Sequence, residues 1–82
     1  MSELRTDEDG NKSWYNENGE RHRENDPAVE FVNGNKYWYQ NGELHREDGP
    51  AIEWNNGDKE WWFNGKQYTE EEYKEKMQGM KV

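Results

Sequence analysis

A repeat of 23 residues is the feature that most constrains the fold of this chain. Five Asn-Gly pairs follow one another at alternating spacings of 15 and 8 residues, which sum to the repeat period. The pairs lie at Asn18-Gly19, Asn33-Gly34, Asn41-Gly42, Asn56-Gly57 and Asn64-Gly65. Trp38 and Trp61 keep the same 23-residue step. A period of this length is typical of small structural units that pack on their neighbours, so we expect a repeat array.

Each repeat reads as three short strands. An Asn-Gly pair between short aromatic runs predicts a tight hairpin turn, because both residues accept a positive φ. The predicted strands span 14–15, 21–23 and 28–31 in the first unit, 36–39, 43–46 and 51–54 in the second, and 60–63 and 66–68 in a shortened third. The sequence therefore predicts an all-β fold, an antiparallel meander of about eight short strands.

Two positions break the repeat in the first unit. The step from Trp14 to Trp38 is one residue longer than the period, and the extra residue, Glu17, lies in a predicted turn. Asn25-Asp26 stands where the second unit has an Asp-Gly turn. An insertion confined to a turn fits a hairpin array, and we expect the turn at Asn25 to be shaped differently from its counterpart.

The last part of the chain changes from strand to helix signals. Thr69 and Glu72 form a capping box, and the Glu70–Lys74 and Glu72–Lys76 pairs have favourable helical spacing. An apolar stripe is formed by Tyr73, Met77 and Met80. We predict a short helix from about residue 70 to 78 that covers the end of the array. The domain organisation is then a flexible N-terminus over 1–8, a β-repeat domain over 9–68 and a C-terminal helix over 69–79.

The second unit carries a recognisable pattern. Residues Tyr37–Trp54 follow Trp-Tyr-x-Asn-Gly-x-x-His-Arg-x-Asp-Gly-Pro-Ala, which resembles a repeat found in proteins of phages and large DNA viruses and is distantly similar to MORN repeats. The resemblance covers roughly residues 9–68. It implies a structural or interaction surface without catalytic residues, and a phage or viral origin. Small acidic phage proteins often bind host proteins, including defence systems such as CRISPR, and the analogy extends that expectation to this chain.

Charge and cysteine content exclude several classes of function. The chain has 19 acidic and 11 basic residues and a net charge of -8, which disfavours direct binding to nucleic acid or to an anionic membrane. It favours a basic protein partner or mimicry of nucleic acid. There is no cysteine and no long apolar stretch. We therefore expect a soluble cytoplasmic protein, in the host cytoplasm if it is phage-encoded, with no cofactor and no metal.

The histidines allow two interpretations. His22 and His45 are each followed by Arg, Glu and a turn with an acidic residue, which could form an acid–base pair or part of a metal site. Alternatively, His and Arg bind the turn carbonyls. The group recurs with the fold period, which a turn needs and an active site does not. We therefore favour the turn role and expect the protein not to be an enzyme.

The aromatic residues form two rows on opposite faces of the predicted sheet, because side chains alternate along a strand. One row contains Trp14, Trp38 and Trp61, and the other contains Tyr15, Tyr39 and Trp62. We expect the Tyr row to face a partner. Its neighbours at equivalent positions of the three units are Ser13, Tyr37 and Glu60, and a position that tolerates such different residues is expected to face water or a partner. The predicted partner-binding residues are Tyr15, Glu17, Asn25, Asp26, Tyr37, Tyr39, Glu60 and Trp62.

Together these features predict a non-enzymatic module that binds a host protein with a basic surface. Two alternatives stay open: a structural or self-assembling module, in which a second copy forms a homodimer, and a carbohydrate-binding module, since aromatic rings with Asn and Asp also suit sugars.

Overall fold

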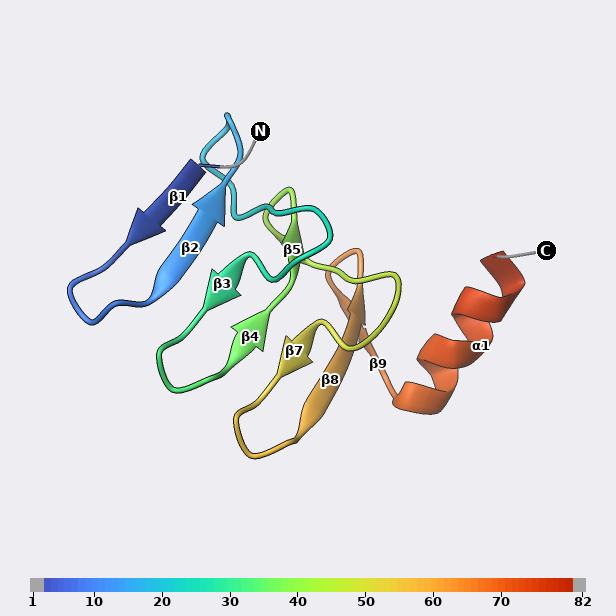
Figure 1. The fold of residues 1–82 in the computed structure, drawn as a ribbon. Coiled ribbons are helices and arrows are strands. Elements are labelled where there is room, and N and C mark those ends of the chain that lie inside the picture. Colours follow the sequence, from blue (N-terminus) through green and yellow to red (C-terminus); the bar gives the residue numbers. More distant parts are fainter. Residues whose placement is uncertain (1–2, 81–82) are drawn as a thin grey trace.

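The computed structural model describes residues 3–80 and folds them into an antiparallel seven-stranded sheet, a separate two-stranded hairpin and one C-terminal helix (Figure 1). The sheet has the order β1 (Glu3–Thr6), β2 (Lys12–Tyr15), β3 (Val29–Glu30), β4 (Lys36–Tyr37), β7 (Ile52–Glu53), β8 (Lys59–Phe63) and β9 (Lys66–Tyr68). The hairpin consists of β5 (Tyr39–Gln40) and β6 (Glu43–Leu44), and the helix α1 covers Glu70–Met80. The predicted antiparallel meander with a short C-terminal helix is confirmed.

In the second unit, Trp38 divides the segment 36–39, which we predicted as one strand, into β4 and β5. The Trp38 N–H donates to the Ala51 carbonyl at 2.7 Å, and the Trp38 carbonyl accepts from the His45 N–H at 3.0 Å. Trp38 therefore passes the chain from the main sheet to the β5–β6 hairpin, and β4 pairs directly with β7. The segments predicted as strands at 21–23 and 43–46 are correspondingly shorter: β6 ends at Leu44, and Arg21 makes a single bridge to Tyr15.

The five Asn-Gly pairs form turns of two kinds. In Asn41-Gly42 both residues have positive φ, as in the two-residue hairpin that we predicted, and Asn64-Gly65 repeats it. The other three pairs, at 18–19, 33–34 and 56–57, have a positive φ at the glycine alone. The extra residue Glu17 lies in a turn of this second kind, which is closed by a hydrogen bond of 3.0 Å from the Gly19 N–H to the Asn16 carbonyl. Asn25 adopts a φ of 67°, so the first unit's departure from the Asp-Gly pattern does give a different turn.

One face of the sheet, which we call the Trp face, carries Trp14, Trp38 and Trp61. The Arg23 guanidinium stacks 3.7 Å from the Trp14 ring, and the Arg46 guanidinium stacks 3.8 Å from the Trp38 ring. Each arginine also donates to a carbonyl in the long turn that directly follows it: Arg23 donates to Pro27, and Arg46 donates to Pro50. Around them, side chains of alternating charge face one another across five strands in the order Lys12, Glu30, Lys36, Glu53 and Lys59.

The buried core is small. The molecule measures only 17 Å in its shortest dimension, which is little more than one sheet with its side chains. The buried apolar residues in the described part of the chain are Pro27, Ala28, Val29, Ala51, Ile52, Phe63 and Tyr73. The two alanines are completely covered, which lets the turns of the Trp face approach the sheet closely. Much of the aromatic surface must therefore lie at half-buried positions.

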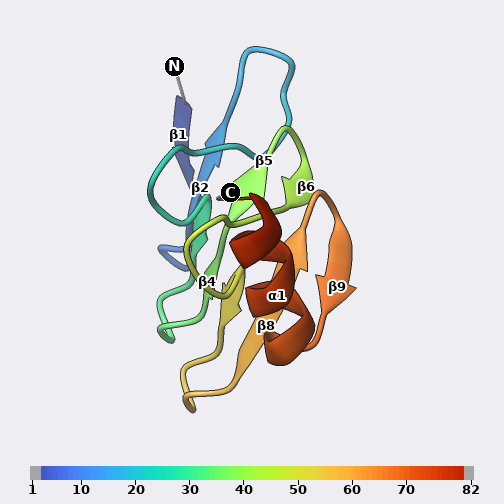
Figure 2. The same ribbon diagram turned by 90° about the vertical axis from the view of Figure 1, so that its right-hand side faces the viewer.

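The helix α1 covers the last strands on the Trp face (Figure 2). Its capping box is formed as predicted: the Glu72 carboxylate accepts the Thr69 N–H at 3.0 Å, and the Thr69 hydroxyl accepts the Glu72 N–H at 3.1 Å. Glu70 and Lys74 pair at 2.8 Å. The Lys76 ammonium lies over the ring of Phe63 instead of pairing with Glu72, whose carboxylate is engaged in the cap.

The apolar stripe of α1 docks through Tyr73 and Met77. The Tyr73 ring is buried and its hydroxyl donates to the Arg46 carbonyl, which ties the helix to the second repeat. Met77 is half-buried. The third predicted member, the Met80 side chain, lies outside the described residues. No helix in the described part of the chain is long and apolar enough to cross a membrane.

The N-terminal segment contains a strand that the repeat did not predict. Within the segment expected to be flexible, residues 3–6 form β1 and pair in register with β2, from Glu3 opposite Tyr15 to Thr6 opposite Lys12. The following turn is closed by Asp7, whose carboxylate accepts the Asn11 side-chain amide. That hydrogen bond lowers the pKa of Asp7. Residues 1 and 2 lie outside the described part.

Burial of Tyr73 predicts a loss of stability at alkaline pH. Desolvation raises the pKa of Tyr73 above its ordinary value of 10.0. The unfolded chain therefore ionises before the folded one, so the contribution of Tyr73 is complete below pH 10.0 and is lost as the pH rises through the folded-state pKa. Chemical denaturation across this range should show a decline that is shallower in Tyr73→Phe. An identical slope in both proteins would contradict this assignment.

Candidate functional site: the aromatic face of the sheet

The face opposite the Trp face carries a continuous cluster of rings. We call it the aromatic face and define it by Phe31, Tyr37, Tyr39, Trp54, Glu60 and Trp62. Tyr37 lies at its centre, with ring centroids 5.2 Å from Phe31, 5.7 Å from Trp54 and 6.5 Å from Tyr39. The first two contacts are edge-to-face and the third is stacked, which are the favourable arrangements for aromatic pairs. Four rings from four different segments thus form one surface.

Glu60 holds the two indole rings of the aromatic face in place. The Trp54 indole N–H donates to one Glu60 carboxylate oxygen at 3.2 Å, and the Trp62 indole N–H donates to the other at 3.1 Å. The Gln67 side-chain amide also approaches the second oxygen, at 3.4 Å. Hydrogen bonds to an ionised carboxylate are stronger than neutral ones. A single acidic residue therefore orients two indoles and places a negative charge inside an apolar surface.

The aromatic face is anchored from below and open above. Val29 and Ile52 pair on either side of Tyr37, and both are buried. All six residues that define the face are half-buried. The helix cannot cover them, because it packs over Trp61, which points to the opposite side of the sheet from its neighbour Trp62. The rings therefore cover aliphatic side chains with one side and present the other outward.

Basic residues stand at one end of this face. The Arg5 guanidinium lies 4.7 Å from the Tyr15 ring centroid, and the Arg21 guanidinium lies 5.7 Å from the Tyr39 ring centroid.

The hydroxyl of Tyr37, at the centre of the face, keeps its proton to a higher pH than an ordinary tyrosine. Burial raises the pKa of Tyr37, and the proximity of Tyr39 and Glu60 raises it further. The centre of the face can thus offer a hydroxyl donor beside a carboxylate, which are complementary partners for a polar group on another protein.

The structure groups five of the eight predicted partner-binding residues on this side of the sheet: Tyr15, Tyr37, Tyr39, Glu60 and Trp62. Glu17 is exposed in the turn that follows β2, and Asn25 and Asp26 are exposed in the first unit's long turn, so these three do not belong to the cluster. The prediction omitted Phe31 and Trp54. Both stand two residues after a buried aliphatic residue, and that alternation would have assigned them to the same face.

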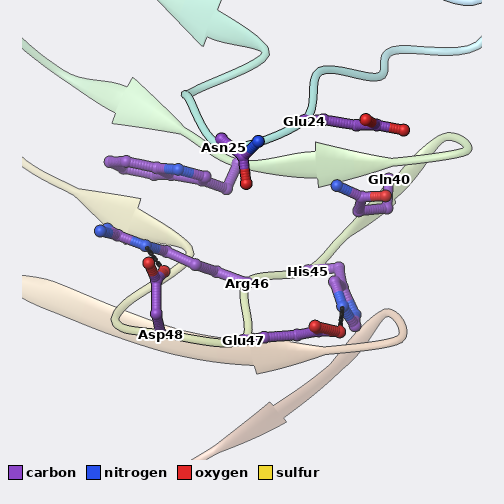
Figure 3. Close-up of a pocket in the computed structure, with 8 residues that line it drawn as sticks. Glu24, Asn25, Gln40, His45, Arg46, Glu47 and Asp48 are labelled. Atoms are coloured by element: carbon purple, nitrogen blue, oxygen red, sulfur yellow. Dashed lines mark hydrogen bonds and ion pairs between the residues drawn. The ribbon is translucent and has the colours of Figure 1, made fainter.

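Asn25 instead lines a hollow of about 360 Å³ between the long turns of the first two units (Figure 3). Glu24 and Asn25 enter from the first turn, and Glu47 and Asp48 enter from the second. Trp38, Gln40, His45 and Arg46 complete its lining. This hollow lies between two successive repeats and is separate from the aromatic face.

The two histidines link one hairpin to the next. His22 Nδ1 accepts the Asn41 N–H at 3.0 Å, and His45 Nδ1 accepts the Asn64 N–H at 3.0 Å. We had expected histidine to bind a turn carbonyl, but that role belongs to Arg23 and Arg46. Nδ1 of each ring is therefore engaged as an acceptor. The other ring nitrogen, Nε2, lies near a carboxylate, at 3.9 Å from Glu24 in His22 and at 3.6 Å from Glu47 in His45. Among residues 3–80, no group of three or more His, Asp or Glu side chains could hold a metal ion.

Comparison with known proteins finds no matching family model, no similar curated protein and no similar solved structure. The resemblance to phage and viral repeats therefore stays a prediction from the sequence pattern.

The geometry around Glu60 predicts a measurable cost for its removal. Glu60→Ala should lower the free energy of unfolding by about 1–3 kcal/mol, because two half-buried indole N–H groups lose their acceptor. The indole N–H resonances of Trp54 and Trp62 should both shift. Glu75→Ala, on the exposed side of α1, is the matched control and should change neither quantity. An unchanged pair of indole resonances in Glu60→Ala would contradict the described geometry.

Proposed function

We propose that this chain is a non-enzymatic protein-binding module that holds a partner with a basic surface on its aromatic face. The observation that carries the proposal is the continuous half-buried cluster of five rings around Glu60, on the side of the sheet that α1 leaves open. Monomeric proteins rarely expose a contiguous apolar surface unless it has an interaction role.

The composition of this face matches that of protein interfaces. Tyrosine and tryptophan are enriched among the residues that dominate binding energy, because they bury large areas at a low cost in conformational entropy. The side chains here are already fixed by ring contacts and by the hydrogen bonds of Glu60. Binding would then require little further ordering, and reduced ordering favours affinity.

The charge of the chain supports a basic partner. The net charge of -8 attracts a positively charged surface at long range, and Glu60 offers a carboxylate at the centre of contact. The repeat resemblance favours one specific form of this function: a phage- or virus-encoded inhibitor of a host defence protein. An acidic surface would suit a host protein that normally binds nucleic acid.

A paired capture experiment tests this function. The immobilised chain and its Tyr39→Ala variant are exposed to lysate of a candidate host at low and at high salt. Tyr68→Ala makes the same change on the other face of the sheet and serves as the control, and denaturation curves verify that all three proteins are folded. We expect the wild type and Tyr68→Ala to retain the same basic protein, and Tyr39→Ala to lose it. Retention by all three proteins, or by none at either salt concentration, would refute the proposal.

A further inference from the structure

The strand β1 has the same place in the sheet as the strand that ends each repeat. β3 and β7 are such strands, and each lies between the first strands of two successive units. β3 pairs with β4 through Glu30 opposite Lys36, and β1 pairs with β2 in the same register, with Thr6 opposite Lys12. The turns after β1 and β3 are also closed alike, each by a glycine N–H that donates to the carbonyl three residues earlier, at 3.1 and 3.0 Å. β1 is therefore equivalent to β3 and β7.

The outer edge of β1 is unpaired. β3 and β7 have strands on both edges, whereas β1 pairs with β2 alone in the described part of the chain. Successive residues of an antiparallel strand direct their backbone groups to opposite edges. The Asp7 N–H bonds to the Asn11 carbonyl across the turn to β2, so the backbone groups of Thr6 point away from β2. Those of Leu4, two residues earlier, point the same way.

At the other end of the sheet, the first strand of the third unit lacks an outer neighbour (Figure 1). β8 pairs with β7 through Lys59 and Glu60, but its pairing with β9 covers only Trp61 to Phe63. In β4 the two equivalent residues are paired on both edges. Beside Lys59 and Glu60 lies a hollow of about 430 Å³, bordered by β9 and the start of α1. Among the described residues, no strand fills the place that β3 and β7 hold in the first two units.

The backbone groups of Lys59 point to this open edge. The Trp38 N–H donates to the Ala51 carbonyl, which directly precedes β7, at 2.7 Å. Lys36 lies two residues before Trp38, so its N–H and C=O also point toward β7. The 23-residue period places Lys59 at the equivalent position of β8. The donor and the acceptor that bind β7 in the second unit are thus available at the edge of the third.

We propose that a second copy of this chain adds its β1 to the open edge of β8, so that one sheet continues from molecule to molecule. The register of the repeat places Thr6 of the second copy opposite Lys59, where the two residues would exchange both backbone hydrogen bonds. Addition of an extended segment to an unpaired strand edge is a general mode of protein recognition. The two joined edges differ, so every copy keeps one edge of each kind and association proceeds head to tail.

The same register brings opposite charges together. Arg5 of the second copy would stand directly across from Glu60, with about 5 Å between the Cβ atoms. Glu60 accepts two indole N–H groups, but no basic side chain in the described part of the chain forms an ion pair with it. The present acidic partner of Arg5 is Glu3 at 3.7 Å, and both side chains are at least 60% exposed. Such an exposed pair contributes little, so Arg5 can exchange it for Glu60.

An apolar pair lies next to this charged pair. Leu4 of the second copy would face Trp61, as Leu4 faces Trp14 within its own chain. Its side chain is 48% exposed, and the contact would cover part of that apolar surface. Its carbonyl would accept the Trp61 N–H, which repeats the bond that Ala51 accepts in the second unit. The proposed interface uses strand edges rather than the ring surface of the aromatic face, so it goes beyond the function proposed above and does not depend on it.

Concentration dependence of the full chain tests the proposal. Sedimentation velocity and amide NMR spectra are recorded at physiological ionic strength, where repulsion between the acidic copies is largely screened beyond about 8 Å. We expect weak association with a Kd on the order of 0.1–1 mM, because the interface is short. The amide resonances of Thr6, Lys59 and Trp61 should shift with concentration. Sedimentation and spectra that stay constant up to the highest concentration would overturn the proposal.

Proline variants test the direction of assembly. Thr6→Pro removes an N–H that β1 does not use to pair with β2, and Lys59→Pro acts at the first residue of β8, where proline is tolerated. Each variant should be folded by circular dichroism and monomeric alone, while Thr6→Ala and Lys59→Ala should associate like the wild type. An equimolar mixture of the two proline variants should form a one-to-one complex, because each retains the edge that the other lacks. Association of either folded proline variant alone, or no complex in the mixture, would contradict the head-to-tail arrangement.

Charge variants at Thr6 test the register without altering the backbone. Thr6→Glu would place a carboxylate between Lys59 of the first copy and Lys12 of its own chain, as the glutamates of β3 and β7 stand between two lysines. Association should tighten about threefold, and Thr6→Lys should weaken it by a similar factor. General repulsion between acidic copies gives the reverse order, which would overturn the proposal. Tyr39→Ala should associate like the wild type even where it loses the partner of the aromatic face, which separates the two proposals.

Discussion

Replacing Arg46 by alanine is expected to lower the free energy of unfolding by about 2–4 kcal/mol, a large share of the stability of so small a domain. Its side chain is only 20% exposed, and the guanidinium makes four contacts at once. It stacks on Trp38, donates to the Pro50 carbonyl at 3.0 Å and pairs with Asp48 and Glu53. The substitution would uncover the indole and leave a half-buried Glu53 carboxylate without its cation. Urea denaturation followed by tryptophan fluorescence measures the change.

Two further substitutions show whether the geometry or only the charge of Arg46 matters. Arg46→Lys keeps the charge but cannot present a planar fork to Asp48 and Glu53 while stacking on the ring, so it should recover less than half of the loss. Arg5→Ala removes a side chain that is 60% exposed and should cost little. A full recovery by lysine would mean that the stacked guanidinium contributes nothing specific.

Replacing Tyr73 by alanine should destabilise the protein by about 3–5 kcal/mol, since it removes the buried ring through which α1 packs on the sheet. Tyr73 is 3% exposed, and its hydroxyl donates to the Arg46 carbonyl. The loss should release α1 from the third unit, where no third turn covers Trp61. We expect lower helix content by circular dichroism together with a reduced denaturation midpoint.

The graded variants of the same helix separate packing from capping. Tyr73→Phe keeps the ring and should cost only about 1 kcal/mol for the lost hydrogen bond. Thr69→Ala removes the cap that accepts the Glu72 N–H and should cost about 1 kcal/mol as well. If Tyr73→Ala were no more harmful than Thr69→Ala, docking of the helix through Tyr73 would be contradicted.

Most of the fold followed from local sequence chemistry. The Asn-Gly pairs gave the hairpin turns, and the Thr69 and Glu72 pair gave the start of α1. What the sequence did not reveal is the change of partner at Trp38, which binds Ala51 on one side and His45 on the other. Alternation along a strand does not signal where pairing passes from one sheet to another, because that depends on tertiary contacts. The strand β1 was missed because it lacks the repeat pattern.

The candidate site was predictable in part. Tyr37 and Glu60 were selected because their position differs between repeats, and both lie at the centre of the aromatic face. The role of Glu60 as acceptor for Trp54 and Trp62 depends on side-chain directions across two strands, which spacing alone does not provide. The hollow at Asn25 likewise depends on two turns that lie a full repeat apart in the sequence.

The central claim is that one face of the sheet builds the fold and the opposite face binds a partner. Trp38 and Tyr39 are neighbours in the sequence and point to these two faces, so measuring both unfolding free energy and partner retention for Trp38→Ala and Tyr39→Ala tests the claim directly. The account predicts that Trp38→Ala mainly loses stability, while Tyr39→Ala stays folded and loses the captured partner. If Tyr39→Ala unfolded as readily as Trp38→Ala, or kept the partner while folded, the division between the two faces would be contradicted.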